Sequence, residues 1–296
     1  MIEDILKKDV KYKRVGQHFN FVESSVESKF YDDFYNHDYA TISKRQLITN
    51  SKELNIDKDL NRVLSLLKNW LQPSSIICEI GGTFFQERSA FIYKYYDNYF
   101  PLDLSVSNIK NYTDFYKKTG ISANATNLPF VDKSLDCVIT HTFLEHVATP
   151  KDVINEIARV LKPNGYVIHV DAWHCRWWHS LGIYHSNSYT NLSTKNKLTY
   201  IGIYIYEMLM LSHLTVIFSR LVNILFRKKS KFLQYSKLKP NYTLNLGKDE
   251  DAAVNIDQVE LMRYYNTLGF KNIISVNFWQ KLFYNDTIVI MQKNNK

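Results

Sequence analysis

The sequence predicts an α/β fold with a mostly parallel sheet, because short apolar runs alternate with helical segments between residues 76 and 170. The runs I-I-C-E-I, Y-F-P-L-D, L-D-C-V-I-T and Y-V-I-H-V each stop at a polar or glycine-bearing turn. Continuous apolar runs of this length are typical of parallel strands buried on both faces. Ligands bind beyond the carboxyl ends of such strands, so the residues after each run are the candidate site residues.

The expected elements follow one another along the chain. A helix over 57–71 carries Leu and Val at three- and four-residue spacing and ends before Pro73. The expected strands cover 76–80, a run ending at Asp103, 135–140, 166–171, 271–276 and 287–291. Further helices are expected over 88–96, 150–161 and from 254 to a closing Gly269, and a turn at 162–165. The two final strands complete the sheet, and the last one is expected to be antiparallel.

Four parts make up the expected domain organisation. Residues 1–56 form an N-terminal helical cap, 57–174 the core, 175–240 a helical and basic insert after the fifth strand of the core, and 241–296 the completion of the core sheet. A chain of 296 residues is long for one domain of about 150 residues and short for two, which favours one decorated domain.

Charge and cysteine content narrow the class of protein. The net charge is +8, but residues 174–239 contain ten Lys and Arg against the single acid Glu207. The basic character therefore belongs to one local surface and does not indicate a nucleic-acid-binding protein. The three cysteines form no C-x-x-C pair, which argues against a disulfide framework and a zinc site, so no metal is expected. We expect a cytoplasmic location, since no secretory signal is visible.

Acidic and glycine residues follow the first two strands of the core. Glu79 precedes Gly81 and Gly82, and glycine lets the backbone adopt positive φ and pass close to a ligand. Asp103, followed by Leu104, stands 24 positions after Glu79. A carboxylate at this distance accepts hydrogen bonds from ribose hydroxyls in dinucleotide sites, so the pair does not by itself name the cofactor. An ordinary tight turn and a solvated aspartate are the alternatives.

Two further segments decide between cofactors. Asn124-Ala125-Thr126 is followed by Leu-Pro-Phe, and the next strand closes with H-T-F-L-E-H-V before a K-P-N-G segment. In this order the segments resemble the class I S-adenosylmethionine (SAM)-dependent methyltransferases, in particular the small-molecule branch that includes the ubiquinone/menaquinone-biosynthesis enzymes. The resemblance implies a Rossmann-like, doubly wound sheet with SAM as cofactor.

The resemblance also assigns roles to particular residues. It implies that Glu79 and the Gly81-Gly82 turn hold the methionine part of SAM, and that Asp103 and Leu104 hold its ribose. Asn124 stands where the family has Asp and would accept from the adenine amino group, while the backbone after it, at Ala125 and Thr126, contacts the ring. The family usually has a further glycine where Phe84 and Phe85 stand.

Two histidines are candidates for catalysis. Methyl transfer from a sulfonium is an in-line displacement that depends on proximity and orientation, and a hydroxyl or carboxyl acceptor also needs a base. His141 and His146 flank the expected methyl position, and His141 is also a candidate cofactor contact; either can instead be structural. Asp171 and His174 are expected on the same rim. The W-H-C-R-W-W-H run at 173–179 forms either an aromatic acceptor pocket or a hinge.

The insert contains an apolar segment over 198–218 with Glu207 near its centre. A single membrane crossing is excluded because the strands before and after the insert join one sheet, and a central acid costs about 2.5–3.5 kcal/mol. One face of a predicted helix carries Leu214, Phe218, Leu221, Val222 and Leu225. The opposite face carries His213, Arg220, Asn223 and Arg227. The alternatives are a substrate lid, a homodimer face, or peripheral contact with an anionic membrane through 198–231.

The leading interpretation is a SAM-dependent methyltransferase that acts on a small-molecule or glycan/lipid-linked acceptor, with O-methylation favoured, in the cytoplasm or at the inner membrane face. A non-catalytic SAM-fold protein that binds a partner is the first alternative. A nucleotide-dependent oxidoreductase is disfavoured because no G-x-G-x-x-G follows the first strand, and nucleic-acid methylation because no N/D-P-P-Y/F motif follows the fourth.

Overall fold

The computed structural model describes residues 2–23, 25, 27–33, 58–81, 92, 94–181, 193–209, 211–226, 231–242, 251–274, 277–284 and 286–295. The chain divides into two compact units. The first contains residues 1–143, 149–171 and 290–296, and the second contains 144–148 and 172–289. The second unit is therefore inserted into the chain of the first.

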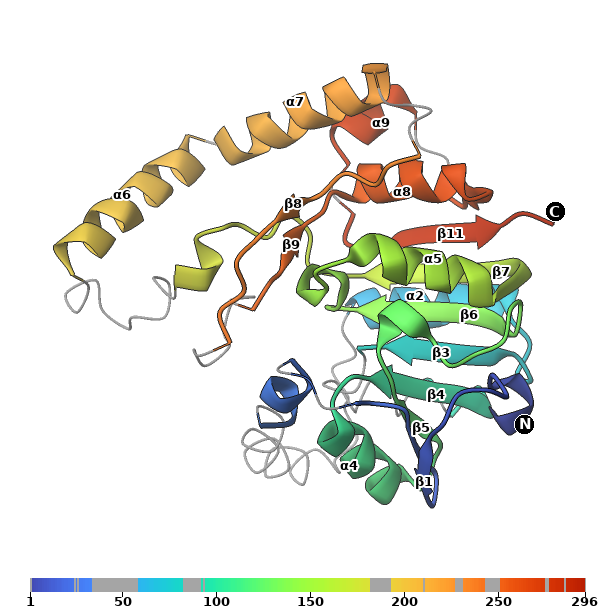
Figure 1. Cartoon of the computed structure of the whole chain (residues 1–296). Helices are drawn as coiled ribbons and strands as arrows, with labels where there is room; N and C mark the ends of the chain where they lie inside the picture. Colours follow the sequence, from blue (N-terminus) through green and yellow to red (C-terminus); the bar gives the residue numbers. More distant parts are fainter. Residues whose placement is uncertain are drawn as a thin grey trace. The chain divides into compact units, whose positions relative to one another are not determined.

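The first unit is built on one sheet (Figure 1), whose strands lie in the order β1-β2-β5-β4-β3-β6-β7-β11. The strands from β2 to β7 pair in parallel, and β1 pairs antiparallel with β2. In Figure 1 the arrow of β11 points opposite to those of β3 and β6. The strands are β1 (Lys13–Val15), β2 (His18–Asn20), β3 (Ile76–Ile80), β4 (Asn98–Asp103), β5 (Gly120–Ser122), β6 (Leu135–His141), β7 (Leu161–Val170) and β11 (Val289–Lys293). The predicted mostly parallel sheet with an antiparallel last strand is confirmed.

Helices cover both faces of this sheet, since Figure 1 shows α2 behind it and α5 in front. The helices of the first unit are η1 (Ile2–Ile5), α2 (Lys58–Trp70), α4 (Val106–Tyr116), η3 (Ala125–Asn127) and α5 (Pro150–Val160). The core contains fully buried side chains from neighbouring strands, among them Ile77, Cys78, Val138 and Ile168. Burial raises the pKa of the Cys78 and Cys137 thiols, so both cysteines stay protonated and pack as small apolar side chains.

The separate turn predicted at 162–165 was wrong, because these residues lie inside β7. Leu135 pairs with Leu161 and Cys137 pairs with Tyr166, so Asp136 alone faces the four residues between them. The additional residues form a bulge. The Lys162 ammonium donates to the Asp136 carboxylate at 2.9 Å and holds this bulge against β6.

The N-terminal region is only partly the helical cap that the sequence predicts. Residues 2–5 and 27–33 are helical, but β1 and β2 occupy 13–20 and extend the sheet through the parallel pairing of β2 with β5. β2 is favoured because its Phe19 is buried, at 1% exposure. The Tyr12 and Phe19 ring centres are 5.5 Å apart, and the Arg14 guanidinium lies 4.8 Å from the centre of the Phe19 ring. Residues 34–57, and most of the helix predicted over 88–96, lie outside the described residues.

The second unit contains the predicted helical insert and the segment that follows it. Asp257 caps α8 by accepting from the backbone N–H groups of Val259 and Glu260, and Gly269 follows that helix at φ +86°. The elements of this unit are η4 (Leu144–His146), η5 (His179–Leu181), α6 (Thr194–Met208), α7 (Leu211–Phe226), β8 (Ser236–Lys237), β9 (Val254–Asn255), α8 (Gln258–Thr267), β10 (Phe270–Asn272) and α9 (Phe278–Leu282).

The orientation of α7 is set by Arg220, which is 3% exposed. Its guanidinium donates to the Asp257 carboxylate at 2.8 Å, to the Gln258 side-chain oxygen at 3.0 Å, and to the carbonyls of Leu282 and Tyr284 at 3.2 and 2.7 Å. A buried guanidinium needs this many acceptors because its desolvation is costly. Arg220 therefore fixes one side of α7 against the loop before α8, the start of α8 and the end of α9.

As a result, α7 buries two residues of its polar side, whereas His213 on the same side is exposed. Arg220 and Asn223, which the sequence places opposite the apolar face, are 3% and 7% exposed. Leu214, Phe218 and Leu225 are 57%, 68% and 59% exposed. The apolar face of α7 is thus unpartnered within the described residues.

Among the described residues, the segments long and apolar enough to be considered as a membrane span lie in α6 and α7. Within the described part of the chain, no single helix has the length and hydropathy of a membrane span. The segments Thr194–Met208 and His213–Phe226 pass the test of length and composition together, as a pair bent by 62°.

Replacing Arg220 tests its structural role. Arg220→Met should lower the free energy of unfolding by about 3–5 kcal/mol, because it leaves the Asp257 carboxylate without its buried partner. Equilibrium urea unfolding followed by circular dichroism measures the change. Arg14→Met is the matched control, since the Arg14–Glu3 pair is about half exposed and should contribute less than about 1 kcal/mol. Equal effects of the two substitutions would contradict the role assigned to Arg220.

Candidate functional site

The strand registers of the first unit bring the predicted cofactor residues to one edge of the sheet. Ile80 lies beside Leu102 of β4 and beside Thr140 of β6, so Gly81, Asp103 and His141 follow these positions at the carboxyl ends of neighbouring strands. Asp103 lies beside Ser122, two residues before Asn124. Four segments that are far apart in the sequence therefore end side by side, which is where ligands bind in open α/β sheets.

Gly81 cannot be replaced by a larger residue without a shift of the backbone. Its φ is +75°, and its N–H donates to the Leu102 carbonyl at 2.9 Å. A Cβ at this position would lie 2.8 Å from the Cβ of Phe143. The turn after β3 thus lies directly against the turn after β6, and the close approach requires glycine. Gly82, the second predicted glycine of this turn, lies outside the described residues.

Glu79 is a buried carboxylate near the end of β3. It is 3% exposed and accepts a hydrogen bond from the Tyr99 hydroxyl on the neighbouring β4. This bond ties the Glu79 carboxylate, on β3, to the neighbouring strand β4. The carboxylate is therefore held two residues before Gly81, at the edge where the resemblance places the methionine part of SAM.

Asp103 is connected to the start of α4. Its Oδ1 accepts from the Ser105 N–H at 2.8 Å, and Leu104 between them is half-buried. Ser105 caps α4, and its hydroxyl donates to Asp32 at 2.6 Å. Asp32 also accepts from the Ser107 N–H at 2.9 Å. The helical segment 27–33 is therefore fastened beside Asp103, a contact that sequence reasoning missed; S-V-S after a strand was the available signal.

Asn124 follows β5 and caps η3, and its amide oxygen is already engaged. Oδ1 accepts from the N–H of Thr126 at 2.9 Å and from the Thr126 hydroxyl at 2.8 Å. These two bonds close a short turn in which Ala125 is buried and Asn124 is exposed. Because both acceptor positions of the oxygen are in use, the Nδ2 group is the part of Asn124 better suited to a ligand, as a donor.

His141 ends β6 next to a strained residue. The His141 side chain is 9% exposed, and its Nδ1 lies 3.1 Å from the hydroxyl of Thr142. Thr142 has φ +45°, a conformation that a β-branched residue rarely adopts. Strain of this kind persists only where surrounding bonds enforce it, and it is common at functional sites.

The bonds that enforce this turn converge on Asp171. Oδ1 of Asp171 accepts from the Phe143 N–H at 3.0 Å, and Oδ2 accepts from the Thr140 hydroxyl at 2.7 Å and lies 3.2 Å from Nδ1 of His169. Burial raises the pKa of Asp171, but its hydrogen bonds with His169, Thr140 and the Phe143 backbone outweigh that effect and lower the pKa below its usual value. Asp171 is thus an anion that holds the turn after β6.

His146 and His174 belong to the second unit. Nδ1 of His146 lies 3.0 Å from the Asp251 carboxylate, and Nε2 lies 3.7 Å from that of Glu145. His174 lies 3.6 Å from Asp257. Burial lowers the pKa of His174; Asp257 opposes this shift and Arg220 adds to it. Both histidines therefore have acidic neighbours within their own unit.

The aromatic run at 173–179 packs within the second unit. The indole N–H of Trp173 donates to the Thr287 carbonyl at 2.8 Å. Trp178 is buried, and its ring lies edge-to-face with that of Tyr206 on α6 at 5.9 Å. These contacts tie the run to its own unit and do not decide between the acceptor pocket and the hinge.

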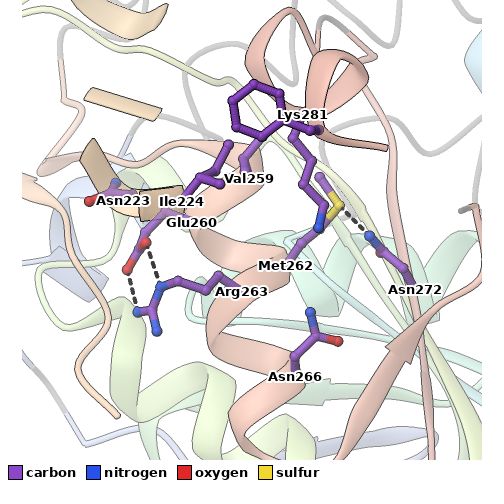
Figure 2. Close-up of a pocket in the computed structure, with 10 residues that line it drawn as sticks. Asn223, Ile224, Val259, Glu260, Met262, Arg263, Asn266, Asn272 and Lys281 are labelled. Carbon is purple, nitrogen blue, oxygen red and sulfur yellow. Dashed lines mark hydrogen bonds and ion pairs between the residues drawn. The ribbon is translucent and has the colours of Figure 1, made fainter. Parts of the chain in front are cut away.

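A separate pocket lies in the second unit, between α7, α8, β10 and α9, with a volume of about 530 Å³ (Figure 2). Two of its charged residues, Glu260 and Arg263, pair with each other at 2.6 Å, and Lys281 also lines the pocket. Asn272 donates to the Met262 sulfur at 2.9 Å. The volume suits a small ligand. The lining contains none of the predicted cofactor residues.

The central segment of the chain matches a known family. Residues 81–169, which include the turn after β3 and the strands β4 to β7, match the family described as a methyltransferase domain. This segment of the chain is therefore similar to a methyltransferase domain. This agrees with the family resemblance seen in the motifs, although nothing in the match singles out the quinone-biosynthesis branch.

A sequence relative of this segment is distant. The malonyl-[acyl-carrier protein] O-methyltransferase of Marinomonas sp. (strain MWYL1) is 31% identical over 71 residues, which span 23% of this chain and 26% of that protein. The chain thus matches about a quarter of the length of this relative.

Two solved structures illustrate the structural likeness. A SAM-dependent methyltransferase from Methanosarcina mazei is 18% identical, with 78% of this chain and 98% of that chain covered and a TM-score of 0.41. The YcgJ protein from Bacillus subtilis is 19% identical, with 39% and 50% covered and a TM-score of 0.36. At these scores neither likeness adds to the argument about the site.

Asp171→Asn tests the anion that holds the turn after β6. The folded-state pKa of Asp171 is lowered, so its stabilisation is fully present above the unfolded value near 3.9 and is lost as pH falls through the folded value. At pH 7 the variant should be less stable by about 1–3 kcal/mol. This difference should shrink as the pH falls below about 4.

Urea unfolding at a series of pH values measures both effects. Asp9→Asn is the control, because Asp9 is exposed and surface substitutions change stability by less than about 0.5 kcal/mol. A constant stability difference between wild type and Asp171→Asn from pH 7 to pH 2 would contradict a buried anion at this position.

Proposed function

We propose that this chain is a SAM-dependent methyltransferase that acts on a small-molecule or glycan/lipid-linked acceptor. The observation that carries the proposal is the meeting of Gly81, Asp103, Asn124 and His141 at one edge of the sheet, within the segment that matches the methyltransferase domain. A carboxylate, a glycine turn and an amide at these strand ends are the groups that an adenosyl ligand with an amino acid tail requires.

The residues of this edge fit the cofactor. Gly81 has no Cβ, and the space that a Cβ would take is filled by Phe143, so the backbone at Gly81 packs closely against the turn after β6. Asp103 has the charge to accept from both ribose hydroxyls, which gives charge-assisted bonds. Asn124 would bind adenine through its Nδ2 donor and a ring nitrogen, since Thr126 occupies its oxygen. SAM supplies the methyl group on a positively charged sulfur.

The chain's own contribution to the reaction is orientation and proton removal. Asp171 fixes the turn that follows β6 and therefore the position of His141 beside the cofactor edge. The hydroxyl of Thr142 orients the His141 ring through Nδ1. In this proposal the His141 ring takes a proton from a hydroxyl acceptor as the oxygen attacks the methyl carbon.

We favour an oxygen acceptor for two reasons. The relative from Marinomonas sp. is named a malonyl-[acyl-carrier protein] O-methyltransferase, and a malonyl group carries a carboxyl oxygen. A histidine at the end of β6 is also the base that oxygen acceptors need. A carboxylate acceptor is already deprotonated near neutral pH, and His141 would then orient it.

Cofactor binding is the first test of the proposed function. SAM and S-adenosylhomocysteine should bind in calorimetry, and Asp103→Ala should weaken binding by about 1–3 kcal/mol because it removes charge-assisted ribose bonds. Asp9→Ala, at an exposed aspartate outside the site, is the matched control and should bind like the wild type. Binding of NAD in place of SAM would favour the oxidoreductase, and no binding of any of the three would overturn the proposal.

His141→Gln tests the base. The variant should keep its affinity for SAM while the turnover number falls by about 10²–10⁴, because an amide cannot accept the acceptor's proton. Transfer from methyl-radiolabelled SAM to a panel of carboxyl and hydroxyl acceptors provides the rate. His213→Gln, at an exposed histidine of α7, is the matched control. A His141→Gln turnover number equal to that of the wild type from pH 6 to 9 would make His141 a structural residue. SAM binding without transfer to any acceptor would favour the non-catalytic alternative.

A further inference from the structure

The apolar face of α7, formed by Leu211, Leu214, Phe218 and Leu225, points into solvent. The four side chains are 39%, 57%, 68% and 59% exposed. Their spacing of three, four and seven residues puts them on one side of the helix. Large apolar side chains gathered on one exposed helix face mark a surface that binds a protein or a membrane.

This exposure is built into the second unit. Arg220 and Asn223 lie on the opposite side of α7, and Figure 2 shows Asn223 and Ile224 at the wall of the pocket beside α8. Turning the apolar face inward would remove the guanidinium of Arg220 from Asp257 and from two carbonyl oxygens. The loss of a buried, fully bonded cation opposes such a rotation.

The preceding helix continues the apolar surface. Of the residues of α6 only Ile203 is buried, and the helix packs on α7 with the Tyr206 hydroxyl 3.3 Å from that of Thr215. The exposed apolar side chains of α6 and the residue after it are Leu198, Ile201, Tyr204, Ile205, Met208 and Leu209. Both helices therefore expose several large apolar side chains.

Basic residues flank α6 and α7 in the sequence. Lys195 and Lys197 lie in the first turn of α6, and R-K-K-S-K at 227–231 follows α7 in the sequence. Glu207 is the only acid between residues 174 and 239. The cation of Arg220 is used inside the unit, so the remaining positive charge belongs to the flanks. Apolar helices flanked by Lys and Arg bind at the boundary between lipid headgroups and acyl chains.

We propose that α6 and α7 form an in-plane element that docks the chain on an anionic membrane surface. The apolar face of α7 enters the headgroup–acyl boundary, and the flanking lysines and arginines contact lipid phosphates. Helices of 15 and 16 residues are short for a span of about 20, and Arg220 keeps one side of α7 on protein, so an in-plane position is favoured over a crossing. A second copy of the chain would bring two strongly basic segments together, whereas anionic lipid complements their charge.

The docking proposal does not depend on methyl transfer, and vesicle flotation tests it with the full chain. Vesicles of phosphatidylcholine with phosphatidylglycerol should carry the protein, vesicles of phosphatidylcholine alone should carry much less, and high salt should release it. Replacing Leu214 and Phe218 together by Ser should weaken the partition by about tenfold or more. Phe115→Ser is the matched control, since Phe115 is 66% exposed in the first unit and should leave flotation unchanged.

Charge is tested separately from apolar contact. Changing Lys195 and Lys197 to Gln should weaken the partition about fivefold per residue on anionic vesicles only. Changing Lys8 and Lys11, two exposed lysines of the first unit, to Gln is the matched control. Circular dichroism and thermal melting verify that each variant folds, and Leu225→Ser serves as a second apolar variant if the double serine variant does not.

Three results would overturn the proposal. The first is an absence of flotation with anionic vesicles at low salt. The second is flotation that Leu214→Ser with Phe218→Ser leaves unchanged. The third is a stable dimer in sedimentation that the same pair of substitutions dissociates while vesicles are not bound, which would assign the surface to a second copy of the chain.

Discussion

The carboxylate of Asp171 is the anchor on which the cofactor edge of the first unit depends. It accepts from the Thr140 hydroxyl in β6 and from the Phe143 N–H in the turn after β6, and it lies beside Nδ1 of His169 in β7. With the turn held in this way, Thr142 keeps a backbone conformation that would otherwise be costly, and Phe143 reaches the Gly81 turn. The ends of β3, β6 and β7 are thereby fixed to one another by a single buried anion.

Arg220 plays the corresponding part in the second unit. It is a buried cation on a helix of otherwise apolar character, and its acceptors come from the α8 cap, α8 itself and the end of α9. Each of the two units thus depends on a buried ion with several hydrogen bonds. A buried ion of this kind adds little net stability compared with apolar packing, but it fixes orientation, because an incorrect arrangement would leave the charge without partners.

The sequence predicted the strands of the core well and the edges of the fold poorly. The strand predicted over 76–80 matches β3, and the helix over 150–161 matches α5 to within one residue, because long buried periodic segments carry a strong signal. The K-P-N-G segment has turn composition but lies in a bulge, since pairing with β6 continues on both sides of it. The strands at 13–20 were missed because they are three residues long.

The candidate site was also only partly visible in the sequence. Motif order located Gly81, Asp103, Asn124 and His141, whereas Asp32 and the Asp171 network depend on contacts between distant segments. The α7 helix shows the limit most clearly, because its apolar and polar faces are plain in the sequence, but periodicity does not say which face is buried. That choice is made by Arg220 and its acceptors, which lie 37 to 64 positions away in the sequence.

The insertion of the second unit into the first has a consequence for synthesis of the protein on the ribosome. β11 belongs to the sheet of the first unit, and Lys293 on it donates to the carbonyls of Ala158 and Leu161 at the end of α5. The ribosome makes Ala158 and Leu161 before residues 172–289 of the second unit, and it makes Lys293 after them. At about 5–20 residues per second, the edge of β7 waits for many seconds without its neighbour. An unpaired strand edge invites misassembly, so early folding of the second unit, which shortens the distance to β11, would protect the nascent chain.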